Sequence, residues 1–325
     1  MLIRAKLRVV SHDFYRKSIK WLNMWYLASE LFQMTMPKEN QQTPTSIYGF
    51  ADAATAFDQR HPHWQGVMTR LHGVINLAFT RTHGVMANDI DKFVYFYGNL
   101  VAEDFMELFL MAANGYGFGA MKLLRSMYEH TVTLKYLHDN PDELQAFFDF
   151  DAIQQYKLTK KIIETFGRDA LPSETLSETE QKYTEVKKQF MVKSCKSKTC
   201  SEERVNHTWS KLDFVSMAKK AGAIGTVIVH NYYVPMRHAH SSFRSMTDRL
   251  EIGEGYVGFQ RESPPEVADQ ALMSAHNCVL VALEVQKERF NIPGLEEAIQ
   301  NSVRDWALVW SPESLACLAS SVSSP

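Results

Sequence analysis

One group of polar residues has the types and spacing needed to bind and cleave a phosphodiester. Arg237, His240 and Arg244 fall within a helix that we expect over residues 235–250. Arg237 is three residues before His240 and Arg244 is four after it, so a regular helix presents all three on one side. Arginine offers planar donors to phosphate oxygens, and histidine can transfer a proton near neutral pH. The alternative is a solvated basic face with a half-buried histidine.

A second group lies on a helix expected over residues 118–139. Arg125 and Glu129 are four residues apart and can form an ion pair on one helix face. His130 is five residues from Arg125, which places it about 140° around a regular helix. Arg125 and His130 therefore do not converge if this helix is regular. The alternative here is an arginine–glutamate pair beside a core helix, with a histidine at the solvent edge.

Long helices must position both groups, because apolar residues recur at helical spacing along most of the chain. Asn114-Gly115 ends one long helix, and Ser263-Pro-Pro-Glu266 predicts the start of another through a capping box. A turn-rich stretch covers residues 253–258. The expected helices are 64–87, 89–113, 118–139, 142–166, 174–191, 209–221, 235–250, 266–290 and 294–310. The predicted fold class is all-α, a helical bundle of about five core helices with a polar helical insertion.

Composition limits the classes of protein that remain. The chain has 325 residues, 45% of them hydrophobic, which is enough for a large core and excludes wholesale disorder. The formal net charge of −2 gives no global reason to expect a nucleic-acid or membrane partner, although a local basic patch stays open. No stretch reaches ~18 uncharged apolar residues, so we expect no membrane partner. Four scattered cysteines predict a reducing, cytoplasmic location.

The predicted domain organisation has one main unit. Residues 61–310 form the bundle domain, with the polar, lysine-rich insertion at 168–206. Residues 36–60 are expected to be a linker and residues 311–325 a tail. Residues 1–35 are a basic extension with three interpretations: an amphipathic surface helix, a targeting segment, or a non-native extension upstream of a protein that starts at Met36.

Metal and cofactor chemistry has little support in the sequence. The chain lacks the zinc motif His-Glu-x-x-His, the di-iron motif Glu-x-x-His, the nucleophile elbow Gly-x-Ser-x-Gly and a phosphate-binding P-loop. Cys195 and Cys200 with His207 have no obvious fourth ligand for zinc. We therefore expect no metal and no cofactor.

The order of motifs resembles a known family. A glycine-rich turn leads into Arg125-Ser-x-x-Glu129, and a tyrosine-rich segment then leads into a helix with His240. This pattern resembles an uncharacterised family of bacterial all-helical proteins, similar in turn to the HEPN superfamily of helical bundles. The resemblance covers roughly residues 90–290. HEPN nucleases carry an arginine, four to six residues and a histidine, a spacing that Arg125 and His130 fit. Ser126 stands where active members often have Asn or Asp.

Two functional hypotheses follow. The resemblance implies a metal-independent RNA endonuclease in phage defence or a toxin module, with RNA as its partner and a homodimer as an open possibility. The alternative is a non-catalytic helical binding or scaffold module whose polar pairs only fix packing. The candidate residues are His240, His130 and Arg125 for catalysis, Arg237 and Arg244 for substrate binding, and Glu129 and Tyr233 for support. We expect His240 and Arg237 to face a cleft shared with helix 118–139, near Arg125 or Glu129.

Overall fold

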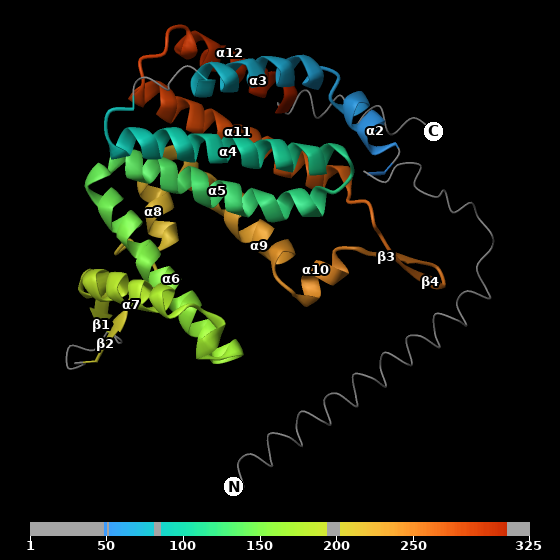
Figure 1. The fold of residues 1–325 in the computed structure, drawn as a ribbon. Coiled ribbons are helices and arrows are strands. Elements are labelled where there is room, and N and C mark those ends of the chain that lie inside the picture. The colour runs from blue at the N-terminus through green and yellow to red at the C-terminus, as the bar shows by residue number, and fades with distance from the viewer. Residues whose placement is uncertain (1–48, 51, 81–85, 194–201, 311–325) are drawn as a thin grey trace. The chain divides into compact units, whose positions relative to one another are not determined.

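The computed structural model describes residues 49–50, 52–80, 86–193 and 202–310. The chain is all-α, as the sequence predicts, and the described part adds two small antiparallel hairpins to the helices (Figure 1). The predictions for residues 1–35, for the tail and for Cys195 and Cys200 lie outside the described residues. In the described part of the chain, no helix combines the length and the hydropathy that a bilayer span requires.

Three long helices pack on one another at the centre of the bundle (Figure 1). They are α4 (Asp89–Ala113), α5 (Gly117–Asp139) and α11 (Pro265–Arg289). Large apolar side chains from all three are fully buried, among them Phe105, Leu124 and Leu283. Their burial is the main contribution to the stability of the bundle, because it removes apolar surface from water wherever two of these helices face each other.

Local sequence sets the junctions around α5. The Asn88 side chain accepts a hydrogen bond from the Asp91 N–H at 3.0 Å, and the Asp91 carboxylate accepts one from the Asn88 N–H at 3.2 Å, which caps α4. Gly115 has a φ of 82° and turns the chain between α4 and α5. A Cβ at Gly117 would lie 2.7 Å from the Ala268 nitrogen. Glycine therefore lets the start of α5 pack directly on α11.

Two further helices cover α11, and a short one precedes them. These are α3 (Trp64–Thr80), α12 (Leu295–Trp310) and α2 (Ala53–Arg60). The rings of Trp64 and Trp310 lie 5.8 Å apart where α3 and α12 meet over α11. Helix α2 contacts α4 and occupies the last part of the range 36–60 that the sequence assigns to a linker.

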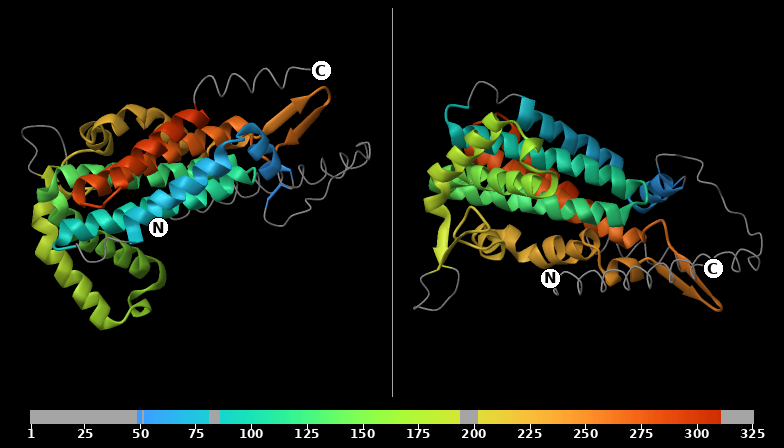
Figure 2. Two further views of the ribbon diagram at one scale, coloured as in Figure 1. Left: turned by 90° about the horizontal axis from the view of Figure 1, so that it is seen from above. Right: turned by 60° about the horizontal axis from the view of Figure 1, so that its bottom comes forward.

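A chain of short helical segments packs on another side of α5 (Figure 2). They are α8 (Phe214–Lys220), the 3-10 helix η4 (Gly222–Val227), the π-helix η5 (Val229–Tyr233) and α9 (Val234–Ala239). The fully buried Tyr128 of α5 donates a hydrogen bond from its hydroxyl to the Ile224 carbonyl at 2.9 Å. This bond anchors the segment on α5, so the residues of η5 and α9 lie along the helix that carries Arg125.

The region around the predicted insertion has a small core of its own. Phe150, Ile153 and Phe190 form a buried cluster, and the rings of Tyr156 and Tyr183 stack at 3.8 Å. The elements are η1 (Pro141–Glu143), α6 (Leu144–Phe166), η2 (Arg168–Ala170), α7 (Ser173–Val186), η3 (Lys187–Phe190), β1 (Met191–Lys193) and β2 (Glu203–Val205). Strands β1 and β2 pair antiparallel.

The continuous helix predicted over residues 235–250 is wrong. Helix α9 ends at Ala239, His240 is extended with φ −106° and ψ 152°, and a new helix, α10 (Phe243–Thr247), begins after Ser242. The Ser242 hydroxyl accepts a hydrogen bond from the Ser245 N–H at 3.1 Å. Serine favours such caps over the interior of a helix, because its hydroxyl bonds nearby backbone groups. The single helix face on which Arg237, His240 and Arg244 were predicted to lie therefore does not form.

A hairpin follows α10 and leads to α11. Strands β3 (Leu250–Gly253) and β4 (Tyr256–Phe259) pair antiparallel, and Gly255 has a φ of 80° at the turn. The hairpin projects from one end of the bundle in both views (Figure 2). The turn between its strands agrees with the turn-rich character predicted for residues 253–258.

Candidate functional site

Arg125 of α5 is the centre of a group of polar side chains from three elements. Its Nη1 lies 2.7 Å from Nε2 of His240, and its Nε donates to the Glu129 carboxylate at 3.1 Å. Its Nη2 donates to the Tyr232 hydroxyl at 3.4 Å, and the guanidinium carbon lies 4.8 Å from the Tyr232 ring centroid. The Arg125 side chain is 21% exposed. The expected proximity of His240 to Arg125 is therefore present, whereas Arg237 pairs with Asp248 and not with a residue of α5.

The break after α9 is what brings His240 to Arg125. Pro235 is buried near the start of α9, and the His240 N–H donates to the Met236 carbonyl at 3.3 Å as the helix ends. The chain then turns away from the helix axis at His240, which is exposed. Its imidazole consequently reaches across to α5, 115 residues earlier in the sequence.

The contact between Arg125 and His240 has one possible donor, the guanidinium, if it is a hydrogen bond. An arginine is always a donor, so the Nε2 atom that faces it is the unprotonated nitrogen. The His240 proton then belongs on Nδ1. The arrangement joins a fixed cation to a nitrogen that can accept a proton, which is the pairing needed to bind an anion and to activate a hydroxyl group. Glu129 partly offsets the charge of Arg125.

Tyr232 contacts Arg125 but is not among the candidate residues predicted from the sequence. It belongs to the π-helix η5, whose wider turn differs from the 3.6-residue period used to read the sequence. Its ring packs on Phe214 at 4.6 Å and covers the Arg125 guanidinium. Tyr233, the predicted supporting residue, is 45% exposed and contacts Tyr232 edge to face at 5.3 Å. The sequence shows that Tyr232 and Tyr233 are adjacent, but the geometry of the π-helix determines that Tyr232 contacts Arg125.

Arg237 and Arg244 share one carboxylate. Nη2 of Arg237 lies 3.5 Å from Oδ2 of Asp248, and Nε of Arg244 lies 2.7 Å from Oδ1. The two arginine side chains are 44% and 65% exposed. They therefore flank His240 along the chain and keep donor groups toward solvent, while Asp248 holds them together.

His130 lies at a different place on α5. Its Nδ1 is 2.7 Å from Oδ2 of Asp104 on α4, and its ring meets Tyr97 edge to face at 5.9 Å. Burial raises the pKa of Tyr97 to about 12. Arg125 and His130 do not share a partner, as expected for five residues on a regular helix. The HEPN-type spacing is present in the sequence, but its two residues take part in separate contacts.

His238 is a second histidine beside the site. Burial lowers its pKa, Asp248 opposes this effect, and the neighbouring cations Arg237, Arg249 and Lys122 add to it. Its ring packs against Phe118 at 5.0 Å, and its buried Nδ1 has no hydrogen-bond partner. The depressed pKa favours a neutral imidazole at pH 7.

The contacts of this region bring together an excess of positive charge. Two carboxylates, Glu129 and Asp248, each neutralise part of it. The cationic side chains are Lys122, Arg125, Arg237, Arg244 and Arg249. These cations outnumber the two carboxylates that pair with them, although the chain as a whole has a net charge of −2.

A group elsewhere in the described residues has the types of side chain that bind metals. His138, Asp139 and Glu288 place one ligand atom each within 4.8 Å of one another. Nζ of Lys135 contacts both carboxylates, at 2.7 Å from Asp139 and 3.3 Å from Glu288. Lys135 already supplies the positive charge that a metal ion would bring. We therefore interpret the group as an ion-pair network between α5 and α11.

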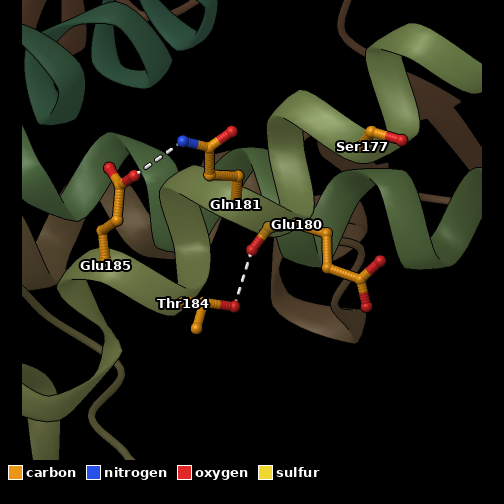
Figure 3. A pocket seen from close by; sticks show the side chains of 5 residues that line it. All are labelled: Ser177, Glu180, Gln181, Thr184 and Glu185. Carbon is orange, nitrogen blue, oxygen red and sulfur yellow. Dashed lines mark hydrogen bonds between the residues drawn. The ribbon is translucent and has the colours of Figure 1, made fainter.

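A shallow pocket of about 430 Å³ lies on α7 (Figure 3). Its lining consists of Ser177, Glu180, Gln181, Thr184 and Glu185. Gln181 donates to the Glu185 carboxylate at 3.0 Å, and the Thr184 hydroxyl donates to the Glu180 backbone oxygen at 2.8 Å. Figure 3 marks both hydrogen bonds. All five lining residues belong to one helix, and no residue of the Arg125–His240 contact lines the pocket.

The structure defines an all-helical protein in which an arginine of the central helix α5 contacts a histidine that follows α9. A model of a family of unknown function, DUF5677, matches residues 101–256. This range is slightly less than half of the chain, and it contains Arg125, Tyr232 and His240. No curated protein and no solved structure matches the chain.

Proposed function

We propose that the protein is a HEPN-like, metal-independent RNA endonuclease that acts in phage defence or a toxin module. The observation that carries the proposal is the 2.7 Å contact between Arg125 and His240, residues from two distant parts of the chain. It unites a phosphate-binding group and a proton acceptor within the sequence range that resembles the HEPN superfamily. The local excess of cations supports an anionic substrate.

The reaction follows from these two groups and from RNA itself. Nε2 of His240 accepts the proton of the 2′-hydroxyl, and the 2′-oxygen attacks the adjacent phosphorus. Arg125 moves its donors from His240 to a phosphate oxygen and stabilises the charge of the phosphorane. The bond from phosphorus to the 5′-oxygen breaks, and that oxygen takes a proton from water. The products are a 2′,3′-cyclic phosphate and a 5′-hydroxyl.

The remaining candidates have supporting roles in the proposal. Arg237 and Arg244 bind neighbouring phosphates, because their donors are exposed on either side of His240. Glu129 holds the Arg125 guanidinium in place through Nε. Tyr233 helps to position Tyr232. We assign His130 no part in this step, because it contacts Asp104 instead.

Purified protein incubated with 5′-labelled RNA in EDTA tests the proposal. Cleavage should persist without divalent ions and should leave 2′,3′-cyclic phosphate ends. Each of His240→Ala and Arg125→Ala should reduce the rate by ~10²-fold or more, the usual contribution of such groups. His72→Ala, which changes an exposed histidine on α3, is the matched control and should have no effect. A requirement for Mg²⁺ or Mn²⁺ would contradict the mechanism.

His130→Ala separates two versions of the site. If it abolishes cleavage while His240→Ala does not, the reaction belongs to His130 and Asp104. The alternative function, a non-catalytic binding or scaffold module, has one observation in its favour: Arg125 is already engaged by Glu129 in an ordinary pair four residues apart. RNA binding without any cleavage, across varied sequences, would favour that module.

A further inference from the structure

The turn after His240 presents an aromatic ring to solvent. Phe243 is 77% exposed at the first position of α10. The turn is held by reciprocal hydrogen bonds, because Ser245 N–H donates to the Ser242 hydroxyl at 3.1 Å and Ser242 N–H donates to the Ser245 hydroxyl at 3.4 Å. The backbone that carries Phe243 is therefore ordered by its own capping box. The exposure of the Phe243 ring is therefore not the result of a loosely held loop.

The surroundings of Phe243 combine apolar and cationic groups. Met246, three residues on and 46% exposed, extends the apolar surface along α10. Arg244 is adjacent in sequence and 65% exposed, and Arg237 on α9 is 44% exposed. Aromatic rings beside arginines are typical of surfaces that bind unpaired nucleotides, where the ring stacks on a base and the guanidinium binds a phosphate.

The spacing links this ring to the proposed reaction centre. Phe243 is three positions after His240, so their backbones are at most about 11 Å apart. A base stacked on Phe243 would thus belong to a nucleotide next to the phosphate held by Arg125 and His240. In a duplex, both faces of each base are covered by neighbours, so only an unpaired or extruded base can use such a ring.

The β3–β4 hairpin is a poorer candidate for the same ligand. Ile252 and Val257 are 77% and 59% exposed, but Glu251 and Glu254 give the hairpin acidic groups. An RNA backbone would be repelled there and attracted at α9 and α10. Charge therefore favours a nucleic acid at Phe243 over one at the hairpin.

We infer that Phe243 is the stacking platform for an unpaired nucleobase and that the ligand of this site is single-stranded RNA. The inference rests on the proposed function for the position of the neighbouring phosphate. It goes beyond that function, because it names the form of RNA and a residue outside the catalytic pair. Binding at Phe243 does not require that the RNA be cut.

A binding experiment with uncleavable RNA tests the inference separately from catalysis. The ligand is a short, unpaired oligonucleotide with 2′-O-methyl groups, and the readout is fluorescence anisotropy in EDTA. Phe243→Ala should weaken binding about tenfold, the scale of one base–aromatic stack. Phe243→Trp should restore affinity, and its indole fluorescence should be quenched by the RNA. Binding of inorganic polyphosphate, which has no bases, should be the same for Phe243→Ala and the wild type.

The matched control is Phe166→Ala, which removes a phenylalanine of similar exposure, 75%, from α6. It should leave RNA affinity unchanged. The inference is overturned if Phe243→Ala binds the oligonucleotide as the wild type does, or if a duplex of the same sequence loses affinity equally. It is also overturned if Phe243→Ala only dissociates a dimer in sedimentation velocity. If RNA binding depends on Phe243 but natural RNA is not cleaved, the proposed nuclease activity is refuted. The inferred stacking of a base on Phe243 is then still supported.

Discussion

A fall in pH from 7 to 5 should destabilise the protein through one buried histidine, His276 on α11. Its side chain is completely buried beside the rings of Trp64 and Phe105. Its Nδ1 accepts a hydrogen bond from the Trp310 indole at 3.3 Å, and its Nε2 has no partner. Burial lowers the pKa of His276 to about 4, against an opposing effect of Asp305.

The direction of this pH effect on stability follows from the proton binding of His276 in the folded and unfolded states. The pKa of this histidine is lower in the folded protein than its value of 6.5 in an unfolded chain, so at pH 5 the unfolded state binds a proton that the folded state does not. The contribution to stability is therefore fully present above about pH 6.5 and is lost as the pH falls toward 4. The shift corresponds to about 3 kcal/mol in total, of which about 2 kcal/mol is lost between pH 7 and pH 5.

Urea unfolding at pH 7 and pH 5 measures this loss. In His276→Gln, the amide oxygen can still accept the Trp310 hydrogen bond, but the side chain does not titrate. The variant should therefore show a pH-dependent loss of unfolding free energy about 2 kcal/mol smaller than that of the wild type. His63→Gln changes an exposed histidine and is the matched control. An equal pH dependence in His276→Gln and the wild type would refute the reasoning.

Three further predictions concern packing and burial. Gly117→Ala would place a methyl group 2.5 Å from the Ser263 hydroxyl and 2.7 Å from the Ala268 nitrogen, so it should destabilise the protein by about 1–3 kcal/mol. Gly73→Ala, in the middle of α3 with no atom within 4 Å of the new group, should stabilise it by about 0.5–1 kcal/mol, and urea unfolding that gave both variants the same sign would contradict the argument. Burial raises the pKa of Cys278 to about 12, so iodoacetamide at neutral pH should label it only as the protein unfolds, and mass spectrometry showing rapid labelling of the native protein would count against this.

The long helices were predictable because their signals are local. The bounds predicted for α4, residues 89–113, agree with the structure, since Asn88 caps its start and Gly115 turns the chain after its end. Helix α11 begins at Pro265, close to the predicted position, but the predicted capping box is wrong: Pro264 is the N-cap, and the Ser263 hydroxyl donates to the Gly115 carbonyl at 3.0 Å instead. Apolar spacing and terminal residues act within a few positions, so the sequence displays them directly.

The break near His240 was not predictable in the same way. Met236, Ala239 and Phe243 have the spacing of a continuous apolar stripe, but no buried surface receives Phe243 in this part of the fold. The local serine cap at Ser242 therefore prevails over the helical pattern. The spacing of apolar residues predicts a helix correctly only where the apolar face packs against another part of the fold.

The sequence by itself determined the all-α class, the central helices and the residue types able to bind and transform a phosphate. Only the tertiary structure decided which of them meet. Arg125 pairs with His240 across 115 residues, and His130, five positions away on the same helix, contacts Asp104 instead. The physical reason is that a helix fixes the directions of its side chains, whereas their partners depend on which elements pack there. The π-helix and the break after Ala239 depend on that packing.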